Sequence, residues 1–150
     1  MGKPANVSAT GVRGVTLYRL PVFPDPRGKL SVGEFQRDIP FLPQRYFLVF
    51  EVPSLERRGA HAHRECHQFL QIVRGSGRIG VDDGQAREEF ALDQPHLALH
   101  TPPMTWVTLS HFSPDAMLIV FCSHYYDPAD YLHDYDDFCR QARAVAPSAA

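Results

Sequence analysis

Two histidines two positions apart have the spacing that points most directly to chemistry. His61 and His63 lie in residues 58–63 (RGAHAH). Successive side chains of a β-strand alternate between its two faces, so residues i and i+2 share one face. Imidazole has an ordinary pKa of about 6.5, so it can accept and donate protons at neutral pH. The pair predicts an acid–base centre inside a small all-β barrel, with His61 and His63 as catalytic residues.

The same spacing raises the question of a metal site. His61 and His63 resemble the first metal-binding motif of cupins, but Gln68 stands where that motif has a glutamate. The second cupin motif, PxGxxH, resembles residues 102–107 (PPMTWV), where Val107 replaces the ligand histidine. A catalytic metal needs about three protein ligands. The pattern therefore favours proton transfer beside a carbonyl, through an enediolate, with no metal or other cofactor.

The cysteines give no sign of a second chemistry. The sequence has three cysteines, Cys66, Cys122 and Cys139, which are widely spaced and form no CxxC pair. This odd number and wide spacing argue against a zinc knuckle or a redox motif. They are typical of reduced thiols in a cytoplasmic protein. Cys66 is near the histidines in sequence, but no feature marks it as an activated thiolate, and we expect it to be a buried structural residue.

Short β-rich segments separated by glycine and proline turns must position these residues. Residues 45–52 (RYFLVFEV) form a continuous β-rich run, which predicts burial on both faces. Residues 69–84 are expected to form two strands around a Gly-Ser-Gly turn, closed by an Asp-Gly turn. Further strands are expected at 12–21, 30–35, 98–100, 106–110 and 116–123, with a turn at 24–28. This spacing predicts an all-β barrel or jelly roll.

The C-terminal part of the chain has a different pattern. Asp127 and Pro128 form a typical helix start, with an acidic N-cap and proline at the first helical position. Tyr131, Tyr135 and Phe138 recur at i, i+4 and i+7, on one face of the expected helix. The tail after residue 142 is expected to be disordered.

Length and charge exclude several classes of protein. The 150 residues suit a single domain, with an ordered core expected at about 11–142. The net charge is -2 and no Lys/Arg cluster is present, so a nucleic-acid partner is not expected. No run approaches the roughly 20 apolar residues that span a bilayer. The polar residues 1–10 do not resemble a signal peptide, so we expect a cytoplasmic protein without a membrane partner.

Several motifs taken together resemble the nucleotide-sugar 3,4-ketoisomerases, the WxcM-like cupins that act on dTDP-4-keto-6-deoxyglucose. The resemblance runs in register from about Asp25 to Phe138. It rests on residues 58–63 (RGAHAH), 68–70 (QFL), 75–77 (GSG), 82–84 (DDG), 102–106 (PPMTW), 112–115 (FSPD) and 123–131 (SHYYDPADY).

The resemblance implies a metal-independent cupin jelly roll with a short C-terminal α-helix. It also implies a homodimer with exchanged N-terminal strands and a dTDP-sugar substrate. The reaction would move the keto group of the hexose from C4 to C3. The product would supply a 3-aminotransferase in the synthesis of 3-amino-3,6-dideoxysugars.

The resemblance also assigns roles to individual residues. His61 and His63 match the catalytic pair, and we expect His63 to move the proton between C3 and C4 while His61 assists at an oxygen. Arg27 matches a sugar contact, and Arg58 is a candidate for the pyrophosphate. The remaining expected substrate-binding residues are Arg45, Tyr46, Gln68 and Trp106.

The chain departs from the family at two positions. Val107 stands where the family often has histidine or arginine, and Phe47 and Leu48 stand where a tyrosine hydroxyl is expected. Three alternatives therefore stay open: a nucleotide-sugar epimerase of similar chemistry, a non-catalytic cupin that binds sugar nucleotides, and a metal-dependent dioxygenase-type cupin. Gln68 and Val107 argue against the last of these.

Overall fold

The computed structural model describes residues 5–53 and 57–145. Within these ranges the chain forms thirteen β-strands, one turn of 3-10 helix and one α-helix. The strands are β1 (Asn6–Ala9), β2 (Thr16–Arg19), β3 (Val22–Asp25), β4 (Gly28–Ser31), β5 (Arg45–Phe50), β6 (Arg58–His63), β7 (Gln68–Arg74), β8 (Gly77–Asp82), β9 (Arg87–Leu92), β10 (Leu97–Thr101), β11 (Trp106–Ser110), β12 (Met117–Cys122) and β13 (Tyr131–Leu132). The helices are η1 (Pro128–Asp130) and α1 (Tyr135–Val145).

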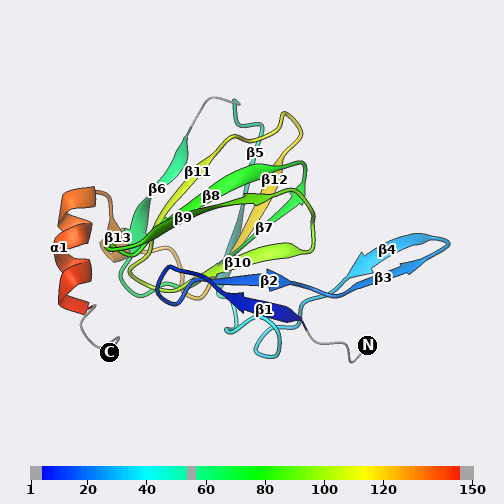
Figure 1. The fold of residues 1–150 in the computed structure, drawn as a ribbon, viewed down its shortest axis with the longest axis horizontal. Coiled ribbons are helices and arrows are strands. Elements are labelled where there is room, and N and C mark those ends of the chain that lie inside the picture. The colour runs from blue at the N-terminus through cyan, green and yellow to red at the C-terminus, as the bar shows by residue number, and fades with distance from the viewer. Residues whose placement is uncertain (1–4, 54–56, 146–150) are drawn as a thin grey trace.

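Two large sheets form the body of the molecule (Figure 1). One has the strand order β1-β2-β10-β7-β12-β5, and the other has the order β13-β6-β11-β8-β9. Every pairing between these strands is antiparallel. Neighbouring strands within each sheet are mostly far apart in sequence, as in a jelly roll. The predicted all-β jelly roll with a short C-terminal helix is therefore confirmed.

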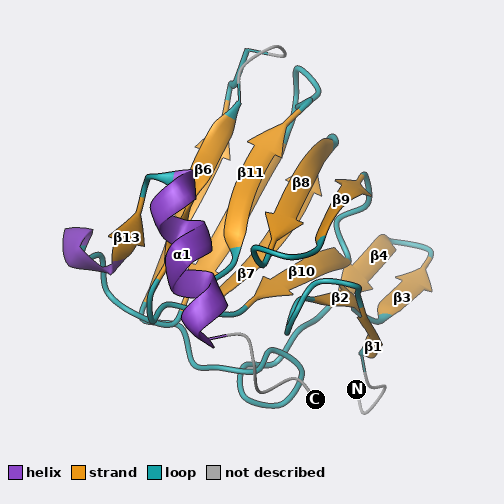
Figure 2. Ribbon diagram, turned by 60° about the vertical axis from the view of Figure 1, so that its left-hand side comes forward, coloured by secondary structure: helices purple, strands orange, loops and turns teal. Residues whose placement is uncertain are grey.

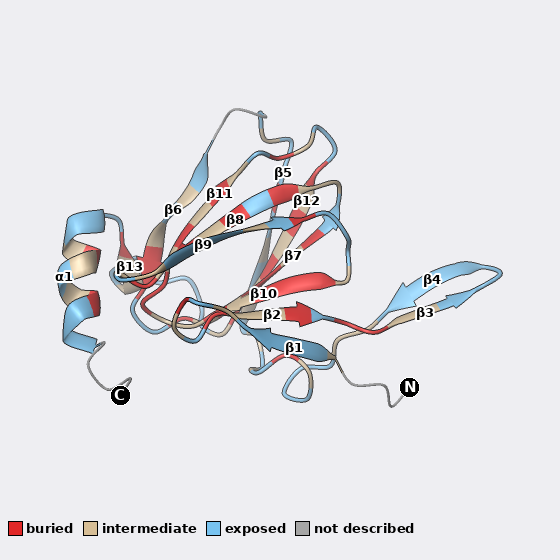
Figure 3. Ribbon diagram, viewed as in Figure 1, coloured by how far each residue is buried: buried red, intermediate tan, exposed pale blue. Residues whose placement is uncertain are grey.

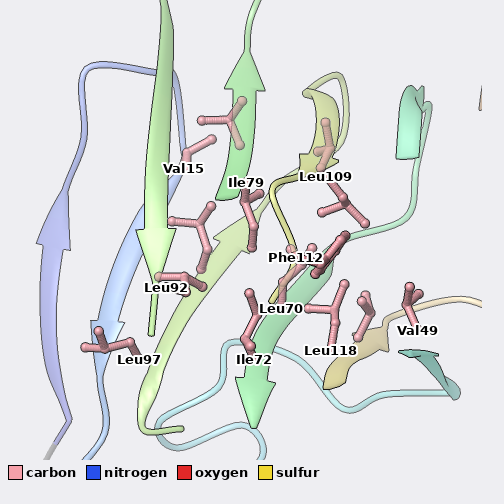
Figure 4. Packing of buried hydrophobic residues seen from close by; sticks show 14 of the residues in the cluster. Val15, Val49, Leu70, Ile72, Ile79, Leu92, Leu97, Leu109, Phe112 and Leu118 are labelled. Atoms are coloured by element: carbon pink, nitrogen blue, oxygen red, sulfur yellow. The ribbon is translucent and has the colours of Figure 1, made fainter. Parts of the chain in front are cut away.

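The main hydrophobic core lies between the two sheets (Figure 4). Leu70 and Leu118 enter it from the six-stranded sheet, and Ile79 and Leu109 enter it from the five-stranded sheet. All four side chains are at most 5% exposed. Burial of such side chains stabilises a fold by roughly 1.5–3 kcal/mol each. This core holds β8 and β11 opposite β7 and β12.

The helix α1 covers the outer face of the five-stranded sheet beside β6 (Figure 2). Phe138 and Ala142 on the helix pack with Ala62 of β6 and Leu132 of β13. No helix in the described part of the chain combines the length and the apolar character needed to cross a membrane.

The predicted helix start was wrong by seven residues. Asp127 caps only the 3-10 turn η1, where its carboxylate accepts a hydrogen bond from the backbone N–H of Ala129 at 3.0 Å. The chain then becomes extended, and Tyr131 pairs with β6 before α1 begins at Tyr135. The α-helix continues to Val145, beyond the expected start of disorder at residue 142, and the end of the chain lies outside the described residues.

Two expectations for the strands also need correction. Residues 45–50 are not buried on both faces, because Tyr46, Leu48 and Phe50 are exposed on the outer face of β5. The strands β7 and β8 form as expected, but they do not pair with each other and belong to different sheets. The turn between them contains Gly75, with φ +70°, where a Cβ would lie 2.8 Å from Ala116 Cα. The Asp-Gly turn instead closes the hairpin of β8 and β9.

A separate hairpin extends away from both large sheets (Figures 1 and 3). It consists of β3 and β4, joined by the predicted turn that contains Arg27. The strand β4 is exposed along its whole length. A two-stranded hairpin without a covering layer is at best marginally stable in water. This hairpin is therefore a candidate for contact with another molecule.

Candidate active site

The two histidines of β6 lie side by side, as the strand pattern predicts. The ring centroids of His61 and His63 are 5.1 Å apart, and the rings meet edge to face at 78°. His63 is only 5% exposed, and His61 is half-buried. The rigid pairing of β6 with β11 and β13 fixes the backbone that carries both rings.

A buried carboxylate orients His63. Nδ1 of His63 lies 2.9 Å from Oδ2 of Asp130, whose side chain is 13% exposed. The second oxygen of Asp130 accepts the backbone N–H of Glu65 at 2.7 Å. An ionised carboxylate can only accept hydrogen bonds, so Nδ1 must carry the proton that it shares with Asp130. Nε2 of neutral His63 then has a free lone pair.

The Nε2 atom of His63 is placed to act as a base. It is buried and has no hydrogen-bond partner among the residues that the structure describes. A buried polar atom normally has a partner, and an exception calls for an explanation such as a catalytic role. The contact with Asp130 holds this lone pair in one direction.

Tyr131 and His133 complete an aromatic cluster around the histidine pair. The centroid of the Tyr131 ring is 4.4 Å from that of His63 and 5.0 Å from that of His61. Tyr131 is the cross-strand partner of His63, so the two side chains lie on the same face. The ring of His133 stacks on Tyr131 at 5.5 Å and lies 5.9 Å from His61. The site therefore offers a hydroxyl next to two imidazoles.

His61 is uncharged at neutral pH. Burial lowers its pKa to about 4, with smaller contributions from the nearby His63 and His133. Burial disfavours the charged form of an imidazole, and neighbouring cations act in the same direction. A neutral imidazole can donate one proton from one nitrogen and accept one at the other. His61 can therefore assist transfer between two oxygens without first losing a proton to solvent.

A small cavity inside the barrel reaches His61. Its volume is about 90 Å³. It is lined by Phe47, Val49, Arg58, Gly59, His61, Gln68, Leu70, Val107, Leu109 and Val120. Sites for small molecules commonly have volumes of roughly 300–1,000 Å³. The cavity is therefore only the floor of any substrate site, and a larger ligand must extend toward the mouth of the barrel.

Three of the predicted substrate-binding residues lie near this floor. Arg58 and Gln68 line the cavity with His61. The guanidinium of Arg45 lies 5.9 Å from the ring centre of Phe47, and its Nε donates to the carbonyl of His124 at 3.3 Å. Burial lowers the pKa of Arg45 whereas the Tyr131 hydroxyl raises it, and the net shift is upward.

The other three predicted residues are not brought to the histidines in this chain. Tyr46 is 63% exposed on the outer face of β5. Trp106 lies on the outer face of the five-stranded sheet, where its ring is 5.3 Å from Tyr135 and 5.6 Å from Phe138. The alternation of side chains explains both positions, because the neighbouring Phe47 and Val107 face inward.

Arg27 is also remote from the histidines. It lies at the turn of the projecting hairpin, where its side chain is 90% exposed and forms an ion pair with Asp25 at 2.8 Å. An ion pair this exposed contributes little to stability. Arg27 is thus free to contact another molecule.

The residues at the cupin metal positions do not fit a metal ion. Val107 is the cross-strand neighbour of His61 and presents no ligand atom. Gln68 directs its amide nitrogen to Cys122 Sγ at 3.6 Å. The histidine pair is therefore left with no strong third ligand at these positions, and no step of the chemistry is assigned to a metal there.

Sequence reasoning missed Asp130, Tyr131 and His133. The sequence predicts that Asp130 and Tyr131 lie at the start of a helix and assigns no role to His133. Asp130 is 67 positions from His63, so only the folded chain brings them together. The available signal was the short polar and aromatic run directly after the last core strand, since functional residues often lie on such connections.

Residues 13–143 match the family described as FdtA: WxcM-like, C-terminal. The chain belongs to this family. A curated relative, TDP-4-oxo-6-deoxy-alpha-D-glucose-3,4-oxoisomerase of Aneurinibacillus thermoaerophilus, is 39% identical over 114 residues. These cover 76% of this chain and 82% of that protein.

Solved structures of WxcM-like relatives share the fold. A 3,4-ketoisomerase from Helicobacter canadensis has a TM-score of 0.83 and 31% identity, over 87% of this chain and 98% of that one. QdtA, a sugar 3,4-ketoisomerase from Thermoanaerobacterium thermosaccharolyticum in complex with TDP, has a TM-score of 0.86 and 29% identity. That match covers 89% of this chain and 98% of the other. The predicted family, cupin fold and enzyme class of this WxcM-like protein are confirmed.

Proposed function

We propose that this chain moves the keto group of a TDP-linked 4-keto-6-deoxyhexose from C4 to C3 without a metal or other cofactor. The observation that carries the proposal is the hydrogen bond between His63 and Asp130 beside His61. The matched relatives act as 3,4-oxoisomerases or 3,4-ketoisomerases, and one of them was crystallised with TDP. The product is a 3-keto sugar, which suits a 3-aminotransferase as the next enzyme.

His63 carries the proton between the two carbons. Nε2 of His63 removes the proton from C3, and the electron pair of that bond enters an enediolate across C3 and C4. The imidazolium that forms is stabilised by the Asp130 carboxylate on Nδ1. The same ring then returns the proton to C4. No atom or electron leaves the sugar, so the step needs no oxidant.

A second proton must move from O3 to O4 to complete the reaction. The neutral His61 and the hydroxyl of Tyr131, whose rings lie 5.0 Å apart, can both donate and accept one. Phe47 and Val107, which also line the cavity, have no exchangeable proton. We therefore assign transfer between the oxygens to His61, with Tyr131 as its partner.

Charged and polar residues around the floor would orient the substrate. Arg58 is a candidate for the pyrophosphate, because an arginine fork matches phosphate oxygens. Gln68 and Arg45 lie closer to the barrel interior and would contact the sugar end. Tyr46 and Trp106 are left out of the site formed by a single chain.

The proposed assembly is a homodimer with exchanged N-terminal strands. The outer face of the six-stranded sheet exposes Tyr46, Leu48, Phe50 and Val73, with exposed fractions between 39% and 63%. An apolar face of this kind commonly marks an interface. The hairpin of β3 and β4 projects from the same molecule and presents Arg27. In the dimer it would carry Arg27 to the sugar site of the partner.

We place the reaction in the cytoplasm. Cys66, Cys122 and Cys139 are free thiols, which is usual for a reducing compartment. Soluble nucleotide sugars are the substrates that the proposed site would take.

Incubation with TDP-4-keto-6-deoxyglucose in deuterated water tests this function. We expect a C3 ketone to form, and any hydrogen that exchanges during transfer to appear as deuterium at C4 in the NMR spectrum. Exchange or inversion at C3 without migration of the keto group would instead indicate an epimerase. Binding of TDP with neither exchange nor migration would indicate a non-catalytic cupin.

A further inference from the structure

Three ligand-type side chains meet at one edge of the histidine pair. One ligand atom each of His63, Cys66 and Asp130 lie within 4.8 Å of one another. They come from the end of β6, from the turn that follows it and from η1. His63 is 5% exposed, Cys66 is 2% exposed, and the side chain of Asp130 is 13% exposed. We call these three residues the His63–Cys66–Asp130 cluster.

Their chemistry suits a thiophilic divalent cation. Zinc binds thiolate sulfur at about 2.3 Å and imidazole nitrogen or carboxylate oxygen at about 2.0–2.2 Å, commonly with three protein ligands and one open position. Tetrahedral ligand atoms at these distances are roughly 3.3–3.6 Å apart, so the Cys66 sulfur needs to approach by up to about 1 Å, whereas the 2.9 Å pair of His63 and Asp130 needs to open slightly. Cys66 lies in the connection between β6 and β7, outside any strand.

A second observation concerns the same imidazole. His63 is only 5% exposed. Its Nε2 atom has no hydrogen-bond partner in the described part of the chain. The ring therefore keeps ligand capacity on the side that Asp130 does not occupy. Magnesium and calcium prefer oxygen ligands, so a sulfur-containing set selects against them.

We propose that the His63–Cys66–Asp130 cluster is an inhibitory binding site for zinc or a similar thiophilic divalent cation. Coordination removes the base whichever nitrogen binds. With the metal on Nδ1, the neutral ring keeps its proton at Nε2, and with the metal on Nε2 the lone pair is donated to the metal. In both cases the Asp130 carboxylate becomes a ligand as well. Metal binding and proton abstraction therefore exclude each other at His63.

Cobalt(II) provides a test that does not depend on turnover. The protein is first dialysed against a chelator and then titrated with Co²⁺, with thiolate-to-cobalt charge-transfer absorption as the readout. We expect one equivalent to produce this absorption, zinc to abolish it and magnesium to leave it unchanged. Cys66→Ser should lose the absorption, whereas Cys139→Ser, which alters a thiol on α1, should keep it.

Inhibition is measured in parallel and rests on the proposed function. Zinc should inhibit the wild-type enzyme, and Cys66→Ser should keep its activity while the inhibition constant for zinc rises at least about tenfold. Retained TDP binding shows that the variant is folded, and Asp130→Asn provides a second variant for the cobalt titration. Charge-transfer absorption that persists in Cys66→Ser, or its absence from the wild type, would overturn the site. A chain that binds cobalt through Cys66 but does not isomerise the sugar would instead overturn the proposed function.

Discussion

Nδ1 of His63 lies 2.9 Å from Oδ2 of Asp130 although the residues are 67 positions apart. The contact joins β6, which carries the histidine pair, to the 3-10 turn that precedes β13. It is reinforced by two backbone contacts, since Arg64 N–H donates to the Asp130 carbonyl at 2.8 Å and Glu65 N–H donates to its carboxylate at 2.7 Å. The carboxylate therefore has little freedom, and its contact with His63 is built into the fold.

Asp130→Asn should lower kcat while leaving KM nearly unchanged. An asparagine amide can present a donor to Nδ1, which would favour the tautomer with its proton on Nε2 and remove the base lone pair. We expect a loss of roughly 10²–10⁴-fold in kcat, the usual contribution of a positioned acid or base. Steady-state kinetics with the TDP-sugar would measure it.

Asp127→Asn is the matched control for this variant. Asp127 caps the same 3-10 turn, but it bonds the backbone of Ala129 and not a histidine. Asparagine is as good an N-cap as aspartate, so η1 should be preserved and kcat should stay near the wild-type value. A wild-type kcat in Asp130→Asn would show that the carboxylate does not orient the base.

The strand part of this site could be predicted from sequence, but its partners could not. The period of two places His61 and His63 on one face without further information. Asp130 and Tyr131 follow Asp127 and Pro128, which are typical of a helix start. The helix that forms there is only one 3-10 turn long. Pairing of Tyr131 with the edge of β6 then overrides the local preference. Such a contact depends on where β6 lies in the folded chain, and the residues near Tyr131 in sequence carry no information about that position.

The positions of Tyr46 and Trp106, away from the histidines in the single chain, have a related cause. The apolar run at 45–50 predicts burial on both faces, yet the outer face of β5 is exposed in the single chain. The alternation of residues shows that a strand face is apolar. It does not show whether other residues of the same chain cover that face. The motif that contains Trp106 predicts that this residue contacts the substrate. Val107 faces inward, however, so its neighbour Trp106 lies on the opposite face of the strand.

Tyr131→Phe should separate exchange at carbon from migration of the keto group. The variant keeps the ring that stacks near His63 and His133 but removes the hydroxyl. His63 can still remove the C3 proton, whereas transfer between the oxygens loses one participant. We expect kcat for migration to fall roughly 10²-fold. Deuterium exchange at C3, followed by NMR, should fall much less.

Tyr126→Phe is the control for the loss of a hydroxyl in the same cluster. Tyr126 is 64% exposed and its ring is 5.7 Å from that of Tyr131. Because it does not touch the histidine pair closely, migration should proceed at nearly the wild-type rate. If Tyr131→Phe slows exchange and migration equally, the hydroxyl has a structural role or acts at the carbon step.

Mixed dimers test whether Arg27 acts in the partner's site. His63→Asn removes the base, and Arg27→Ala removes the exposed guanidinium of the hairpin. Each homodimer should be inactive or nearly so. After joint unfolding and refolding, half of the dimers should be mixed, and each should contain one site with His63 from one chain and Arg27 from the other. We expect activity to return to about a quarter of the wild-type level by this random pairing.

The outcome distinguishes two positions for Arg27. If Arg27 served the site of its own chain, each chain of a mixed dimer would carry one defect and no intact site would form. No activity above the sum of the two parents would therefore exclude exchange of the hairpin. Light scattering on each variant shows whether the dimer itself persists.

His100 should make the protein less stable in mild acid. Its Nε2 lies 3.0 Å from Nδ1 of His67, and burial followed by the charge of His67 lowers the pKa of His100 to about 4. The unfolded chain takes up this proton near the ordinary value of 6.5, whereas the folded chain does not until about pH 4. The free energy of unfolding should thus fall as the pH decreases from about 6.5 to 4. The loss attributable to His100 should be roughly 1–3 kcal/mol, at about 1.4 kcal/mol per pKa unit with allowance for partial exposure.

Urea unfolding of His100→Gln between pH 4.5 and pH 7.5 measures this contribution, because glutamine cannot take up the proton in either state. The variant should lose part of the pH dependence, so that its deficit relative to the wild type is larger at pH 7.5 than at pH 4.5. His111→Asn is the control, since His111 is exposed and asparagine tolerates its φ of 56°. An unchanged pH slope in His100→Gln would mean that His100 is protonated in the folded protein and that the pair with His67 shares a charge.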